Sequence, residues 1–142
     1  MNTDETDRNK SLEELEHDVW GEPDFEWHLV MKVHRLRRKP LNEFTTEDLR
    51  MMIGQEVGLP FLVPIAIERL EIDPLADGNF YRGDLLSNVC RINESFWTDQ
   101  PGYRQRVVEI VRRARSLPDF EEVPLESVEF FVRFLNRSTS TK

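Results

Sequence analysis

The chain has 142 residues and a single cysteine, which is enough chain for one domain with a hydrophobic core but excludes an internal disulfide and any multi-cysteine metal site. Its longest apolar stretch, residues 58–67, contains two prolines and is about half the length that a membrane-spanning helix needs. The net charge is −8, and the acidic, polar N-terminus lacks the apolar run of a secretory signal, so we expect a soluble protein of the cytoplasm.

Both ends of the chain are predicted to be tails. Residues 1–10 contain no apolar side chain after Met1, which predicts a disordered acidic tail, and the polar residues 138–142 predict a second one. The chain between them, residues 11–137, shows helical periodicity and no internal repeat. We therefore expect one helical domain over 11–137.

Two helices are predicted near the N-terminus. Ser11 and Glu14 have the spacing of a capping box and open a short helix. Pro23 suits the first turn of the next helix, which is predicted over 24–39 and ended by Pro40. Its basic C-terminal turn complements the helix dipole, which is a simpler explanation than a phosphate site. Its apolar residues recur at helical spacing and predict a buried stripe of Phe25, Leu29, Val33 and Leu36.

Two more helices are predicted in the middle of the chain. Thr45 or Thr46 caps the first of them, and Gly58 is a plausible stop. The second runs over 59–73, and Pro64 is tolerable inside it if the proline falls in the first turn. The predicted buried face of the first of these helices consists of Leu49, Met52, Ile53 and Val57.

Three further helices follow. Asp84 can cap a helix that continues to about Ile92, and Pro101 opens another that Pro118 ends. Pro124 opens the last one. The inward residues expected for the helix after Pro101 are Tyr103, Val107, Ile110, Val111 and Ala114. Those expected for the last helix are Leu125, Val128, Phe131, Val132 and Leu135.

No stretch of the sequence shows the alternation of a strand. The pair Phe80-Tyr81 and the single Val123 are too isolated to count. The sequence therefore predicts an all-α fold, a compact single-domain bundle of about seven short helices.

The sequence contains no convincing catalytic or metal-binding pattern. His17, His28 and His34 do not have the spacing of a helical zinc pair, and Cys90 lies among apolar residues as a core side chain would. The glycines do not form a phosphate-binding motif. We therefore expect a protein that is not an enzyme and that needs neither cofactor nor metal.

The negative charge is concentrated at one end of the chain. Residues 1–26 hold ten acidic residues against two basic ones, whereas the remaining residues hold equal numbers of each. Such a field repels nucleic-acid phosphate and attracts basic partners. The alternative is a solvated segment that only keeps the protein soluble.

Aromatic rings stand among these acids. An aromatic anchor surrounded by side chains of one charge sign is a feature of tight protein interfaces. The candidate binding residues are Asp18, Trp20, Glu22, Asp24 and Glu26. The alternative for Trp20 is that it pins the first helix to the core, and the two roles are compatible.

Three stretches resemble the immunity proteins of bacterial contact-dependent growth inhibition systems. They are KSLEELEHDVWGEP at 10–23, LRRKPLNEFTTEDLRMMIGQEVGLPFLVPIAIERLEIDPL at 36–75 and GNFYRGDLL at 78–86. The resemblance covers residues 10–97 and is weaker through the last two helices. It implies a cytoplasmic protein that binds the C-terminal toxin domain delivered by sibling cells and blocks it. Such toxins are often basic nucleases.

The mechanism that we expect is stoichiometric inhibition, in which the acidic patch docks over a basic groove and takes the place of nucleic-acid phosphates. Other readings stay open. The chain could be an antitoxin or adaptor that binds a different protein, or an enzyme with an unrecognised helical site. It could also bind nucleic acid through 32–39 and the arginines at 112–115, although its acidity disfavours that. The oligomeric state is open.

Overall fold

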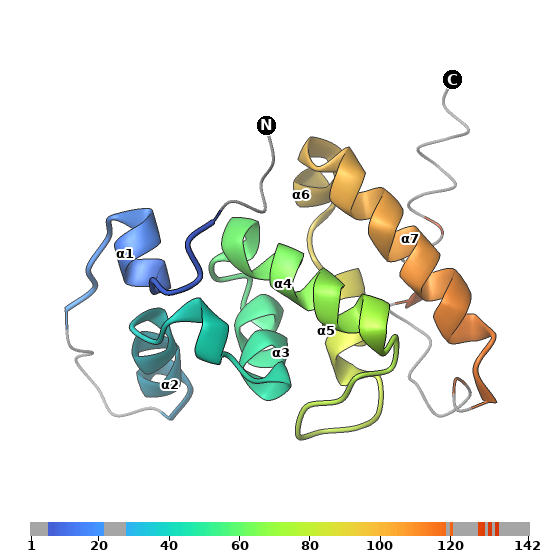
Figure 1. Ribbon diagram of the computed structural model, residues 1–142, viewed down its shortest axis with the longest axis horizontal. Coiled ribbons are helices and arrows are strands. Elements are labelled where there is room, and N and C mark those ends of the chain that lie inside the picture. Colours follow the sequence, from blue (N-terminus) through green and yellow to red (C-terminus); the bar gives the residue numbers. More distant parts are fainter. Residues whose placement is uncertain are drawn as a thin grey trace.

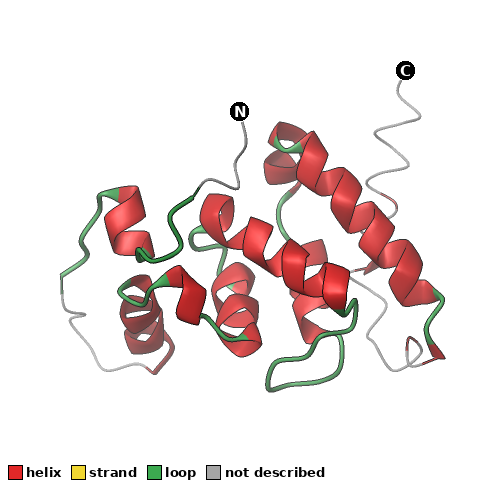
Figure 2. Cartoon of the chain, in the orientation of Figure 1, coloured by secondary structure: helices red, strands yellow, loops and turns green. Residues whose placement is uncertain are grey.

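The computed structural model describes residues 6–21, 28–118, 120, 128, 129, 131 and 133. This part of the chain forms seven α-helices and a short 3-10 turn and contains no strand, which confirms the all-α prediction (Figures 1 and 2). In chain order the elements are α1 (Leu12–Glu16), α2 (His28–Arg37), η2 (Leu41–Glu43), α3 (Thr46–Gly54), α4 (Leu59–Ile72), α5 (Asp84–Cys90), α6 (Glu94–Asp99) and α7 (Pro101–Arg115). None of these helices is both long and apolar enough to cross a membrane.

Helix α4 is the centre of the fold. It packs against α3 and α5 and, along its other side, against α7 (Figure 1). It is buried on most of its circumference, which explains why its sequence is apolar almost throughout. Because α4 begins at Leu59, Pro64 lies in its second turn rather than in the predicted first turn. The proline has no N–H to donate to the carbonyl of Pro60, one turn earlier.

Local capping signals set several helix boundaries. The capping box of Ser11 with Glu14 is present, and Thr45 is the residue that caps α3. Gly58 does not stop α3, which ends at Gly54, but forms the N-cap of α4 with a φ of 68°. A Cβ at this glycine would lie 2.7 Å from a methyl carbon of Leu12. The glycine therefore admits both the left-handed backbone and the Leu12 side chain that docks α1.

The predicted buried faces are largely correct. The five predicted residues of α7 are all buried, and so are Val33 and Leu36 of α2. Leu29 of α2 is an error of prediction, because 45% of it is exposed. Phe25 lies outside the described residues, as do most residues of the helix predicted after Pro124. The following members of the predicted faces are buried in the structure: Leu49, Met52, Ile53, Tyr103, Val107, Ile110, Val111, Ala114, Val128 and Phe131.

The end of the predicted N-terminal tail contacts the folded domain. Arg8 forms a two-pronged ion pair with Glu68 of α4, with nitrogen–oxygen distances of 2.7 and 2.6 Å. The carbonyl oxygens of Arg8 and Lys10 also accept hydrogen bonds from the backbone N–H groups of Asn42 and Leu41. Because these contacts are polar, they produce no apolar periodicity from which the sequence could predict them. The division of the chain into tail, domain and tail is otherwise still a prediction.

Candidate functional site

Trp20, the predicted anchor, is half-buried against α2. Its ring lies over the guanidinium of Arg37, 4.1 Å from ring centre to Cζ, and stands edge-on to His34 with 5.2 Å between ring centres. Its indole N–H donates to the carboxylate of Asp18, with 3.2 Å between nitrogen and oxygen. Trp20 thus pins the segment after α1 to α2, which was the alternative to an interface role. The interface role stays a prediction.

Arg37 is the buried partner of this segment. Only 1% of the residue is exposed, and its Nη2 donates to the carboxylate of Glu16 at 2.7 Å and to the backbone carbonyl of Asp18 at 2.8 Å. Its Nε and Nη1 atoms are buried and have no hydrogen-bond partner. The guanidinium therefore ties the end of α1 to α2, while Asp18 itself remains exposed. Of the predicted acidic patch, Glu22, Asp24 and Glu26 lie outside the described residues.

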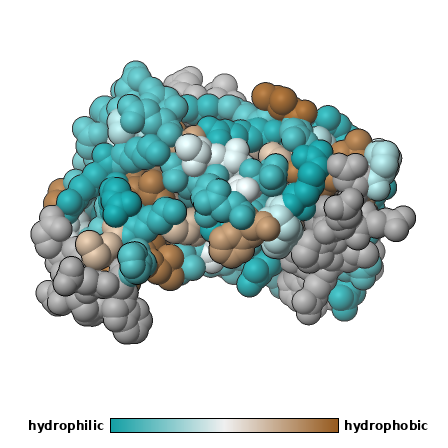
Figure 3. Space-filling view, turned by 90° about the horizontal axis from the view of Figure 1, so that it is seen from below, coloured by the Kyte–Doolittle hydropathy of each residue, from teal (hydrophilic) through white to brown (hydrophobic). Residues whose placement is uncertain are grey.

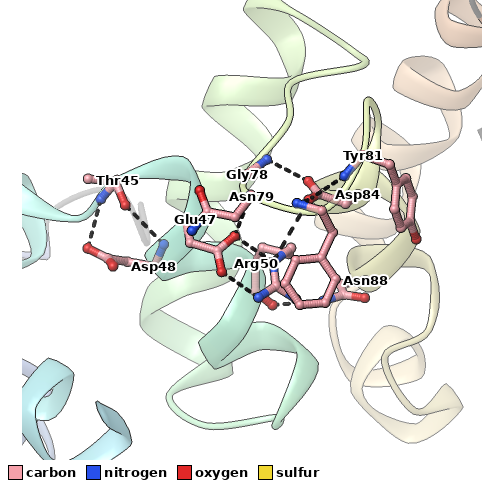
Figure 4. A network of polar contacts seen from close by, with 10 residues as sticks. Thr45, Glu47, Asp48, Arg50, Gly78, Asn79, Tyr81, Asp84 and Asn88 are labelled. Atoms are coloured by element: carbon pink, nitrogen blue, oxygen red, sulfur yellow. Dashed lines mark hydrogen bonds and ion pairs between the residues drawn. The ribbon is translucent and has the colours of Figure 1, made fainter. Parts of the chain in front are cut away.

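A second surface is formed by the loop that joins α4 to α5. This loop, residues 73–83, carries two exposed aromatic side chains, Phe80 at 70% and Tyr81 at 36%. The carboxylate of Asp84, which is 1% exposed, accepts hydrogen bonds from the backbone N–H groups of Gly78, Phe80 and Tyr81 at 2.6, 3.0 and 3.3 Å (Figure 4). Because one buried carboxylate holds three backbone N–H groups, the loop has a fixed conformation.

Helix α3 supports the same loop from the other side. One oxygen of the Glu47 carboxylate accepts from the backbone N–H of Asn79 at 2.8 Å. Both oxygens of Glu47 also accept from Arg50, at 2.7 and 2.5 Å. The guanidinium of Arg50 lies 4.1 Å from the ring centre of Phe80 and 3.9 Å from the Asp84 carboxylate. Figure 4 shows these groups converging from α3, the loop and α5.

Close packing explains the residues at either end of the loop. A Cβ at Gly78 would lie 2.3 Å from a carboxylate oxygen of Glu47 and 3.1 Å from its Cα, so no side chain fits there. Asp84 was predicted to cap α5, but the N-cap is Gly83 and Asp84 is the first helical residue. Its carboxylate turns back to the loop, where it accepts from three backbone N–H groups.

A groove of about 410 Å³ runs beside this loop. Its walls include Leu29 of α2, Arg50 of α3 and the two loop aromatics, Phe80 and Tyr81. Asn88 and Arg91 also line it. The loop lies at the lower edge of Figure 1, and the view from below shows hydrophobic atoms gathered in a few patches on a largely hydrophilic surface (Figure 3). The groove thus joins exposed apolar side chains from separate parts of the chain.

Two carboxyl groups beside the loop have lowered pKa values. The hydrogen bond from Arg50 is the main cause for Glu47, whose pKa lies below its ordinary value of 4.5. Burial alone would raise the pKa of Asp48, but hydrogen bonds from Lys39 and from Thr45 outweigh it and bring the pKa below 3.8. The ionised form of each carboxyl group is therefore more favourable in the folded chain than in the unfolded chain.

These shifts predict how stability depends on pH. A carboxyl whose folded pKa is lowered contributes stability above its unfolded pKa and loses it as the pH falls through the folded pKa. The free energy of unfolding, measured with urea, should therefore fall between about pH 5 and pH 3. In Glu47→Gln this fall should be shallower, so that the two proteins converge at low pH. A parallel pH profile for the two proteins would contradict the assignment to Glu47.

The described residues offer little for chemistry. Among them no group of three or more His, Cys, Asp and Glu side chains could hold a metal ion. Cys90 is buried in α5, which confirms its prediction as a core side chain. Burial raises the pKa of its thiol, which disfavours the reactive thiolate.

Sequence reasoning missed the aromatic loop. The pair Phe80-Tyr81 is too short to predict a strand. It lies in the stretch GNFYRGDLL that carries the family resemblance, but neither pattern predicts an exposed loop. The signal was their position between Gly78 and Gly83 with an acidic residue directly after, because turn residues around exposed aromatics indicate a presented loop.

A family model described as CDI immunity proteins matches residues 14–107. No curated protein and no solved structure matches the chain. The matched region runs from within α1 to the middle of α7 and includes Trp20, Arg37 and the aromatic loop.

Proposed function

The chain belongs to the CDI immunity proteins, the immunity proteins of contact-dependent growth inhibition, and from this premise we propose that it inhibits the toxin domain of its own system by forming a stoichiometric complex. The observation that carries this proposal is the family match, which spans residues 14–107. The protein acts by binding and catalyses no reaction, in the cytoplasm of the cell that makes both proteins.

The toxin proposed as partner is a basic nuclease. The net charge of −8 arises within the first 26 residues, and a basic surface that binds nucleic acid is complementary to it. Asp18, Glu22, Asp24 and Glu26 take the place of phosphates in this arrangement, with Trp20 as the anchor. The contact of Trp20 with Arg37 supports it, because a ring already held in place loses little entropy on binding.

A growth assay tests this function. The toxin domain encoded directly upstream is expressed with and without this protein in cells that lack both. We expect growth to be restored by this protein and not by an unrelated immunity protein. Continued arrest, with both proteins soluble and the toxin active, would refute the proposal.

The charge of the N-terminal region predicts electrostatic steering of the toxin. The association rate constant should fall about tenfold or more between low and high salt, because screening removes the long-range attraction. Stopped-flow fluorescence at several salt concentrations measures this rate. The matched variant neutralises acids only, with Glu22→Gln, Asp24→Asn and Glu26→Gln together, and should show a weaker salt dependence. A rate that does not change with salt would contradict steering.

A further inference from the structure

The loop between α4 and α5 is held by more polar contacts than its turn requires. The buried carboxylate of Asp84 accepts three of its backbone N–H groups, and Glu47 accepts a fourth from Asn79. Burying a carboxylate is unfavourable unless hydrogen bonds compensate, and here the compensating bonds come from the backbone of the loop. These hydrogen bonds fix the position of Phe80 and Tyr81 at the surface.

These two rings border a groove that is open to a partner. One face of Phe80 is covered by the guanidinium of Arg50, while 70% of the residue stays exposed. Leu29 of α2, which is 45% exposed, adds a further apolar wall. Asn88 and the charged Arg50 and Arg91 also line the groove, so that more of its surface is polar than apolar. An exposed aromatic ring beside polar groups is typical of a surface that contacts a side chain of a partner protein.

We propose that this groove is a docking site of the toxin domain, which inserts an apolar side chain between Phe80 and Leu29. This inference rests on the proposed function and adds a contact surface to it. Phe80 supplies contact area on a backbone that is already ordered, so little conformational entropy is lost on binding.

Two observations favour the toxin over a second copy of this chain as occupant. The net charge of −8 makes two copies repel one another, whereas a basic toxin is attracted. The groove also lies near the Trp20 surface, because Leu29 and Arg37, on which Trp20 packs, are eight residues apart on α2, or about 12 Å along the helix. An interface of ordinary size is about 30 Å across, so one partner can cover both surfaces.

The experiment measures binding of the full chain to the purified toxin domain encoded upstream, by titration calorimetry. Phe80→Ala is compared with Ile72→Ala, which removes a side chain that is 85% exposed at the end of α4. We expect Phe80→Ala to raise the Kd tenfold or more and Ile72→Ala to change it less than twofold. Leu29→Ala should also raise it. Circular dichroism establishes that each variant keeps its helices.

Each result separates this inference from the proposed function. If the wild type binds and rescues growth while Phe80→Ala and Leu29→Ala each change the Kd less than tenfold, the groove is not the docking site, although the function stands. If the wild type neither binds nor rescues, both proposals fall. If the wild type self-associates in analytical ultracentrifugation and Phe80→Ala abolishes this without affecting toxin binding, the occupant is a second copy and the proposal is wrong.

Discussion

Replacing Arg37 with alanine is expected to lower the free energy of unfolding by about 2–4 kcal/mol, because the change removes both hydrogen bonds of a buried guanidinium, one of which is its ion pair with the half-buried Glu16. Arg37 is 1% exposed and joins Glu16 and the carbonyl of Asp18 to α2. The ring of Trp20 also loses the guanidinium on which it lies. Urea unfolding followed by circular dichroism measures the change.

Arg37→Met is the matched variant, since it keeps most of the side-chain volume without the charge. The Nε and Nη1 atoms of Arg37 are buried without partners, so the wild type bears a desolvation cost that methionine removes. A hydrophobic replacement of a buried charge is often close to neutral. We therefore expect Arg37→Met to recover at least half of the loss. Equal destabilisation by both variants would show that the polar contacts dominate over the volume.

Trp20→Ala separates the structural role of this cluster from its proposed role in binding. Trp20 is only half-buried, so the fold should persist, while binding to the toxin should weaken by about 2 kcal/mol, the value typical of an interface anchor. Calorimetry with the toxin domain measures this. Unchanged affinity, or loss of the fold, would remove Trp20 from the interface.

The elements that the sequence predicted well are those with local signals. The capping boxes at Ser11 and Thr45 each join residues three apart, so the contact can be recognised within one turn. Helix α6 was missed even though Asn93 caps it, because six residues are too few to show a period. Leu29 was wrongly predicted to be buried. Periodicity shows which residues share one face of a helix, but it does not show how much of that face other helices cover.

The aromatic loop depends on contacts that no local pattern reveals. Glu47 and Asn79 are 32 residues apart, yet their hydrogen bond fixes the loop. Arg50 reaches both Phe80 and the Asp84 carboxylate from a different helix. Only the fold brings α3 and α5 together, so the exposed rings could be noticed in the sequence but not recognised as a prepared surface.

Trp97 of α6 lies within the residues that the family model matches and contacts a residue beyond them. Trp97 is 1% exposed, and its ring meets Phe131 edge-on with 5.5 Å between ring centres. The family match ends at residue 107, so Phe131 lies beyond it. If this contact stabilises Trp97, Phe131 is part of the same cooperative unit as α6.

Trp97→Ala is therefore expected to cost about 3–5 kcal/mol of stability, the usual effect of removing a large buried ring. Phe96→Ala is the control, because this neighbouring ring is only half-buried and should cost less. A double-mutant cycle with Phe131→Ala should give a coupling energy of about 0.5–1.5 kcal/mol, as edge-to-face ring pairs do. Additive effects would mean that Phe131 does not stabilise Trp97. A clear coupling would show that the core of the matched region depends on a residue that the family match does not include.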